Sequence, residues 1–229
     1  MKTPETPITV LLVDDHTIVR EGLRMVLEVE KDIQVIAEAR SGREAVELVK
    51  KFQPDVVVMD IAMPLLNGFE ATRQILKLFP AIKVLILSAY NDDEYIDQMI
   101  AAGAAGYLIK QSSAQVLSKA IREVKNGNVF FGSDIAKRLE EKNKKSLGRN
   151  GISKKKSAGL SSREAEVLQL IAEGKANKQI ASELEISIKT VEKHRQHLMH
   201  KLHIHDTAGL TRYAISAGII ENSIQRTIR

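Results

Sequence analysis

Short apolar runs alternate with stretches of helical spacing over the first 126 residues. Runs rich in β-branched residues predict strands at 8–13, 33–38, 55–60, 83–88 and 106–109. Between and after them, apolar side chains recur with a helical period over 16–29, 43–52, 68–79, 92–102 and 113–125. Because the runs are nearly continuous in apolar residues, we expect strands that helices cover on both faces. This alternation predicts the α/β class, with a doubly wound, five-stranded parallel sheet.

The pattern changes after residue 127. Residues 128–157 are dominated by Lys, Asn, Ser and Gly, which bury too little apolar surface to fold alone. They predict a linker, in which residues 135–142 have the composition of a short helix. From there the period is helical, with short helices expected over 162–173, 177–184, 188–202 and 206–217. We therefore expect an α/β domain over 6–127, a linker over 128–157 and a small all-α domain over 158–224.

Composition and charge narrow the functional classes. The 229 residues are 44% hydrophobic and 28% charged, as in globular proteins, and the absence of cysteine excludes a disulfide scaffold or a thiolate site. Neither a signal peptide nor an apolar run near membrane-spanning length is evident, so we expect a cytoplasmic protein with no membrane association. Residues 1–131 contain 15 Lys/Arg and 18 Asp/Glu, whereas residues 132–229 contain 19 and 11. A basic second half indicates a polyanionic partner.

Carboxylates follow two of the predicted strands. Asp14 and Asp15 come directly after the first strand, and Asp60 closes the third. In parallel sheets, functional groups gather just beyond the carboxyl ends of the strands. Three carboxylates brought together there repel one another unless a cation joins them. The trio therefore indicates a site for a hard divalent ion such as Mg²⁺.

The order of motifs around these carboxylates carries a family resemblance. Residues 8–126 resemble the receiver domain of two-component response regulators, which has a flavodoxin-like fold. The positions that carry the resemblance are Asp14, Asp15, Asp60, Met63, Pro64, Gly68, Ser88, Tyr107 and Lys110. The spacing of Tyr107 and Lys110, an aromatic residue three positions before a lysine, is that of the last strand in the family.

The resemblance implies a role for each of these groups. Asp60 would be the phosphoacceptor, and Mg²⁺ would be held by Asp14, Asp15, Asp60 and the backbone carbonyl of Ala62. Lys110 would contact a phosphoryl oxygen, while Ser88 and Tyr107 would form the switch that reads the modification. Two positions beyond Ser88, we interpret the bulky Tyr90 as a residue that slows loss of the phosphoryl group.

The second domain has the form of a helix-turn-helix. Two helices joined by a tight turn, the second longer and basic, predict this motif over 177–202. Residues 160–164, 177–181 and 189–194 resemble the LuxR-type module of NarL/FixJ-type regulators. The resemblance implies that Glu192, Lys193 and Gln196 read base edges. It implies phosphate contacts from Lys178, Thr190, His194, Arg195 and Lys201.

The role of Glu192 in this domain stays open, and a cluster of histidines raises the question of a metal. Glu192 either accepts a hydrogen bond from a DNA base or forms an ion pair on the helix surface with Lys189 or Lys193. Five of the six histidines lie between 194 and 205, but a spacing of three drifts around a helix and no thiol or carboxylate accompanies it. We therefore do not expect a zinc site.

Together the two resemblances imply a two-component response regulator and not an enzyme. Its partners would be a sensor histidine kinase, double-stranded DNA and, after phosphorylation, a second copy of the chain, for which the helix over 206–217 is the candidate surface. Two alternatives remain: an aspartyl-phosphate hydrolase, and a regulator whose DNA binding ignores phosphorylation.

Overall fold

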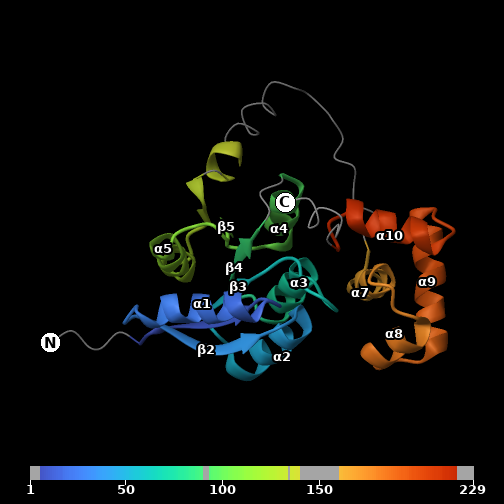
Figure 1. Ribbon diagram of the computed structural model, residues 1–229, viewed down its shortest axis with the longest axis horizontal. Helices are drawn as coiled ribbons and strands as arrows, with labels where there is room; N and C mark the ends of the chain where they lie inside the picture. The colour runs from blue at the N-terminus through green and yellow to red at the C-terminus, as the bar shows by residue number, and fades with distance from the viewer. Residues whose placement is uncertain (1–5, 90–92, 134, 140–159, 221–229) are drawn as a thin grey trace. The chain divides into compact units, whose positions relative to one another are not determined.

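The computed structural model describes residues 6–89, 93–133, 135–139 and 160–220 (Figure 1). The chain divides into two compact units. Among the described helices, none combines the length and apolar character that a bilayer crossing requires.

The first unit is built on a parallel sheet with the strand order β2-β1-β3-β4-β5-β6. All neighbouring strands pair in parallel. This confirms the predicted α/β class. The strands are β1 (Ile8–Val13), β2 (Ile33–Ala39), β3 (Val56–Met59), β4 (Lys83–Ser88), β5 (Gly106–Ile109) and β6 (Phe130–Phe131).

The sixth strand lies where the sequence predicted a linker. Phe130 N donates to Ala105 O at 3.0 Å and Gly132 N to Tyr107 O at 3.0 Å, so the chain adds a short edge to the sheet. Residues 135–139 are helical, and the side chain of Ile135 is fully buried. The prediction of five strands is therefore one short. Two residues are too few to show a period in the sequence.

Helices cover both faces of this sheet (Figure 1). Helices α1 and α5 contact each other on one face, and α2, α3 and α4 follow one another on the other. Alternate strand residues such as Val10, Val58 and Leu85 pack with α1 and α5 in one core. The helices are α1 (Thr17–Glu28), α2 (Gly42–Phe52), α3 (Gly68–Leu78), α4 (Asp93–Ala102) and α5 (Ala114–Lys125).

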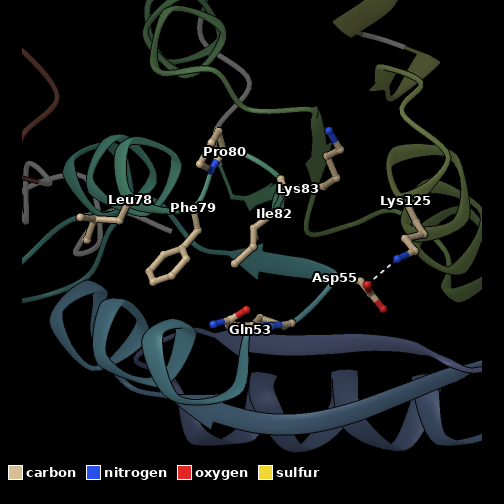
Figure 2. A pocket seen from close by; sticks show the side chains of 10 residues that line it. Gln53, Asp55, Leu78, Phe79, Pro80, Ile82, Lys83 and Lys125 are labelled. Carbon is tan, nitrogen blue, oxygen red and sulfur yellow. Dashed lines mark hydrogen bonds and ion pairs between the residues drawn. The ribbon is translucent and has the colours of Figure 1, made fainter.

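The amino-terminal edge of the sheet carries a hollow of about 440 Å³ (Figure 2). At its rim, Asp55 accepts from both Thr9 N and Thr9 Oγ1 at 2.9 Å and pairs with Lys125. These contacts tie β1, β3 and α5 together. The carboxylate of Asp55 thus helps to hold the fold together at this edge.

The second unit is a small helical domain. A capping box joins Ser161 and Glu164 at its first helix, and the turn between α8 and α9 has Glu185 at φ 53°. Its core includes Val167, Ile180 and Leu198. The helices, each within one residue of the prediction, are α7 (Ser162–Ala172), α8 (Asn177–Glu183), α9 (Ile188–Leu202) and α10 (Thr207–Ser216).

Candidate functional site

Strands β1 and β3 bring three carboxylates to one edge of the sheet. Val13 pairs with Met59, so the residues that follow, Asp14, Asp15 and Asp60, emerge side by side. Asp14 is 1% exposed and Asp60 5% exposed. One ligand atom from each of Asp14, Asp15, His16 and Asp60 lies within 4.8 Å of the others. The carboxylates that the sequence grouped do lie together.

Lys110 places a cation between two of these carboxylates. Its Nζ lies 2.6 Å from Asp14 Oδ2 and 2.9 Å from Asp60 Oδ2. The residue follows β5, and its backbone N donates to Ser88 O at 2.7 Å, which fixes its position beside β4. The ammonium group can therefore neutralise charge on a group attached to Asp60.

Burial and charge act against each other at this edge. Burial raises the pKa of Asp60 to about 6, Lys110 opposes this rise, and the neighbouring Asp14 adds to it. Burial by itself would lower the pKa of Lys110, but Asp60 and Asp14 outweigh it and the pKa is raised. At neutral pH, Asp60 is thus a desolvated carboxylate beside the ammonium group of Lys110, which stays protonated.

The loop after Asp60 is held by a close backbone approach. Asp60 Oδ1 accepts from Ile61 N at 2.8 Å, and Gly68 N donates to Ile61 O at 2.8 Å. A Cβ atom at Gly68 would lie 2.1 Å from Asp60 O, so only glycine fits there. Ala62, whose carbonyl the resemblance assigns to the ion, belongs to this loop.

Ser88 and Tyr107 share one face of the sheet. Ile86 pairs with Tyr107 and Ser88 with Ile109, and paired residues of parallel strands point the same way. Ser88 is 0% exposed and Tyr107 1% exposed, so both side chains are directed inward. The predicted switch pair therefore lies within the core beside the acidic edge. Tyr90 falls outside the described residues.

The sequence reasoning missed two residues at this edge. His16 Nδ1 lies 2.7 Å from Asp15 Oδ1 and 3.2 Å from Asp14 Oδ1. The buried Arg20 donates from a terminal nitrogen to Asp14 O at 2.7 Å and thereby fixes the turn that carries Asp14. Both follow the first strand within the predicted helix, where the helical period gave no reason to assign them to the site.

The oxygens of this cluster fit a hard divalent ion. Asp14 Oδ2 and Asp15 Oδ1 are buried, and each has one nitrogen close by: Lys110 Nζ lies 2.6 Å from Asp14 Oδ2, and His16 Nδ1 lies 2.7 Å from Asp15 Oδ1. Buried carboxylate oxygens with unused lone pairs are the donors that Mg²⁺ prefers. The donor set is therefore compatible with the ion that the sequence indicated.

In the helical domain, all three predicted base-reading residues are exposed on α9. Glu192, Lys193 and Gln196 are exposed on this helix, as is Lys178 on α8. Among the ion pairs of residues 160–220, none includes Glu192. The alternative of a helix-surface ion pair for Glu192 thus has no support in the geometry.

The predicted phosphate-contacting residues differ in their surroundings. Thr190 takes part in the cap at Ser187, and Arg195 donates to Thr207 Oγ1 at 3.0 Å. Lys201 Nζ lies 2.8 Å from Glu164 Oε2, which joins the end of α9 to the capping box of α7. Burial, with nearby Arg163, lowers the pKa of the half-buried His194, which favours the neutral form of its imidazole.

Comparison with known proteins decides the family. Residues 10–122 match the response regulator receiver domain, and residues 158–214 match the bacterial regulatory proteins of the luxR family. The transcriptional regulatory protein LiaR of Bacillus subtilis (strain 168) is 41% identical over 207 residues, which cover 90% of this chain and 96% of LiaR. This chain belongs to the LuxR-type response regulators. The transcriptional regulatory protein DegU of Brevibacillus brevis is 36% identical over 213 residues, covering 88% and 90% of the two chains.

Solved structures resemble this response regulator over nearly its whole length. The complex of the response regulator RcsB with DNA has a TM-score of 0.57 at 27% identity, covering 92% of this chain and 99% of RcsB. RcsB from Salmonella enterica serovar Typhimurium, bound to promoter rprA in the presence of phosphomimetic BeF₃⁻, has a TM-score of 0.55 at 26% identity, covering 91% and 98%. Another structure contains two RcsB dimers bound to two parallel DNAs. Receiver and luxR-type domains are thus combined here as in DNA-binding regulators of transcription.

Among the described residues, one group of three or more His, Cys, Asp or Glu side chains is close enough to hold an ion, and it is the acidic cluster of the receiver. His200 and His203 lie near each other, with ring centroids 6.4 Å apart. The histidines of α9 therefore form no such group.

Proposed function

We propose that Asp60 accepts a phosphoryl group from a partner sensor histidine kinase and that the modified receiver controls DNA binding by α8 and α9. The observation that carries this proposal is the contact of Lys110 Nζ with both Asp14 and Asp60. It places a cation where a phosphoryl oxygen on Asp60 would need one.

The transfer needs a carboxylate nucleophile and neutralised phosphoryl oxygens. An oxygen of Asp60 forms the new bond to phosphorus, the bond from phosphorus to the donor nitrogen breaks, and the donor imidazole keeps the electron pair. Lys110 contacts a phosphoryl oxygen and limits the repulsion from Asp14. Asp14, Asp15, Asp60 and the carbonyl of Ala62 would hold Mg²⁺, which would supply the remaining neutralisation when bound.

The donor protein has a candidate surface beside this edge. A hollow of about 220 Å³ between α1 and α5 is lined by Lys110 and by apolar residues of α1. On the same helix, Ile18 is 79% exposed and Met25 is 62% exposed. A kinase domain that covers these side chains would bring its phosphohistidine to the carboxylate edge. Contiguous exposed apolar surface with a polar rim is typical of protein–protein interaction sites.

The switch would pass through Ser88 and Tyr107. A phosphoryl group adds about −1.5 to −2 charge at neutral pH, and a hydroxyl donor at the end of β4 is placed to respond to it. Tyr107 packs on the same face of the sheet and would report the movement to the surface around α4 and β5.

On the DNA side, Glu192, Lys193 and Gln196 read base edges in the major groove. Phosphates are held by Lys178, Thr190, His194, Arg195 and Lys201. Two copies of the chain, paired when phosphorylated, would present two α9 helices to half-sites about one helical turn apart. Lys201 must exchange Glu164 for a phosphate oxygen, so its contribution is smaller than that of an unpaired lysine.

The chain acts as a cytoplasmic regulator and not as an enzyme. A hydrolase of aspartyl-phosphate type needs a second acid placed to act on the leaving group or on water. The residues that follow Asp60, Ile61 and Ala62, offer none.

In vitro selection of bound DNA tests the proposal. The full chain is incubated with a random duplex library, with and without acetyl phosphate and Mg²⁺, and Asp60→Asn serves as the matched control. We expect a defined binding site whose enrichment rises with the phosphodonor for the wild type and stays unchanged for Asp60→Asn. Equal enrichment for both proteins under both conditions would favour a regulator whose DNA binding ignores phosphorylation.

A further inference from the structure

His16 occupies a position at the acidic edge that neither its helix nor the phosphoryl chemistry explains. It is the N-cap residue of α1, but its side chain makes no capping hydrogen bond. Its backbone N donates to Asp14 Oδ1 at 2.8 Å, which holds the residue against the cluster. The imidazole is turned toward Asp14 and Asp15, while 41% of the side chain stays exposed.

The spacing of the imidazole from the carboxylates is that of neighbouring ligands on one ion. His16 Nδ1 lies 2.7 Å from Asp15 Oδ1 and 3.2 Å from Asp14 Oδ1. With metal–ligand bonds of about 2.1 Å, adjacent ligands of an octahedral ion are separated by about 3 Å. The two measured distances lie on either side of this value. Nδ1 is therefore the ring nitrogen that is placed for ligation, and Nε2 would carry the proton.

The chemistry of imidazole decides which ions would use this nitrogen. Mg²⁺ takes oxygen ligands and keeps several waters, so it gains little from a ring nitrogen. Imidazole suits first-row transition-metal ions, and affinity for mixed nitrogen and oxygen sites rises from Mn²⁺ through Co²⁺ to Ni²⁺. The same cluster can thus hold Mg²⁺ through oxygens alone and a transition-metal ion through oxygens and His16.

We propose that His16 Nδ1 is a ligand for a divalent transition-metal ion such as Co²⁺ or Mn²⁺ at the cluster of Asp14, Asp15 and Asp60. This inference rests on the proposed function only in placing a divalent ion at these carboxylates. It gives the receiver a second class of ion, which would compete with Mg²⁺ for the edge that carries the phosphoacceptor. The ordinary alternative is that His16 only forms a hydrogen bond with Asp14 and an ion pair with Asp15.

Calorimetric titration of the full-length chain with MgCl₂ and with CoCl₂ separates these two roles. The variants are His16→Ala, Asp60→Asn, which removes a cluster ligand, and His197→Ala, which removes an exposed histidine of α9 and leaves the cluster intact. We expect His16→Ala to weaken Co²⁺ binding at the cluster by about tenfold and to change Mg²⁺ binding by less than about twofold. His197→Ala should leave both affinities at the cluster unchanged.

Electron spin-echo spectroscopy of bound Mn²⁺ provides a direct readout. A ring nitrogen bound to the ion gives a nitrogen modulation, which we expect in the wild type and in His197→Ala but not in His16→Ala. If Co²⁺ affinity and the nitrogen signal are the same in His16→Ala and wild type while Mg²⁺ still binds, the inference about His16 is wrong. If the wild type shows no binding of Mg²⁺ or Co²⁺ that Asp60→Asn removes, the proposed metal-assisted phosphoacceptor site itself is wrong.

Discussion

The most informative single substitution is Asp60→Asn in the absence of metal. Burial and Asp14 make the ionised form of Asp60 costly, and they raise its pKa from 3.8 to about 6 despite Lys110. A tenfold change in proton affinity corresponds to about 1.4 kcal/mol, so the folded state loses about 3 kcal/mol when Asp60 is charged. Asparagine keeps an acceptor for Ile61 N but carries no charge. We expect Asp60→Asn to be about 1 to 3 kcal/mol more stable than wild type at pH 7.5 in EDTA.

The pH dependence of the stability difference follows from the raised pKa of Asp60. Between the usual pKa of 3.8 and the folded value of about 6, the native state binds more protons than the unfolded state, so wild-type stability falls as the pH rises. The advantage of Asp60→Asn should therefore be fully present above pH 6 and shrink to under about 1 kcal/mol at pH 4. Mg²⁺ should stabilise the wild type more than the variant, because binding to the folded state adds stability.

Urea unfolding followed by tyrosine fluorescence measures this difference, since Tyr90, Tyr95 and Tyr107 all lie in the receiver. Asp55→Asn is the matched control, and its expected effect on stability has the opposite sign. Burial works to raise the pKa of Asp55, but hydrogen bonds from Lys125 and Thr9 outweigh it and the pKa is lowered. Asp55→Asn should therefore destabilise the receiver at neutral pH, and this loss should fade as the pH falls. A less stable Asp60→Asn at pH 7.5 would refute the electrostatic reasoning.

Three further predictions concern other contacts. Lys110→Gln should slow phosphorylation of Asp60 by small phosphodonors about a hundredfold; a rate within threefold of wild type, measured by stopped-flow fluorescence, would contradict the role of its ammonium group. Lys178→Gln should reduce the slope of the logarithm of the DNA-binding constant against the logarithm of salt concentration by about 0.9, and it should weaken binding equally across DNA sequences. Glu192→Gln should instead change the preferred base and leave that slope unaltered. Fluorescence anisotropy at several salt concentrations measures both effects. Ser161→Ala should destabilise the helical domain by about 1 kcal/mol, because it removes the acceptor of the Glu164 N–H. Urea unfolding followed by circular dichroism measures this loss. An unchanged unfolding midpoint would show that the cap does not contribute to the stability of the domain.

The sequence predicted the carboxylate edge because strand ends follow from the hydrophobic pattern, and functional groups of parallel sheets gather just beyond the carboxyl ends of the strands. Once β1 and β3 are neighbours in a parallel sheet, Asp14, Asp15 and Asp60 must emerge together, and the structure places them so. Gly68 illustrates what a motif alone does not explain. Glycine is required at this position because a Cβ atom would lie 2.1 Å from Asp60 O, a contact that only the three-dimensional structure reveals.

Contacts that depend on side-chain direction could not be predicted. His16 reads as the start of a helix, and only its ring orientation places it among the carboxylates. The partner of Lys201 lies 37 positions earlier in the chain, so no local pattern indicates the ion pair with Glu164. Strand β6 was missed for another reason: Phe130 and Phe131 are held by backbone hydrogen bonds to β5, and two residues show no period.

Mass spectrometry of the full-length chain after treatment with acetyl phosphate and Mg²⁺ shows directly whether Asp60 is a phosphoacceptor. We expect one added phosphoryl group on the peptide that contains Asp60, stable in acid, lost in base and absent from Asp60→Asn. A wild-type protein with no such adduct at Asp60, or with an equal adduct in Asp60→Asn, would contradict it.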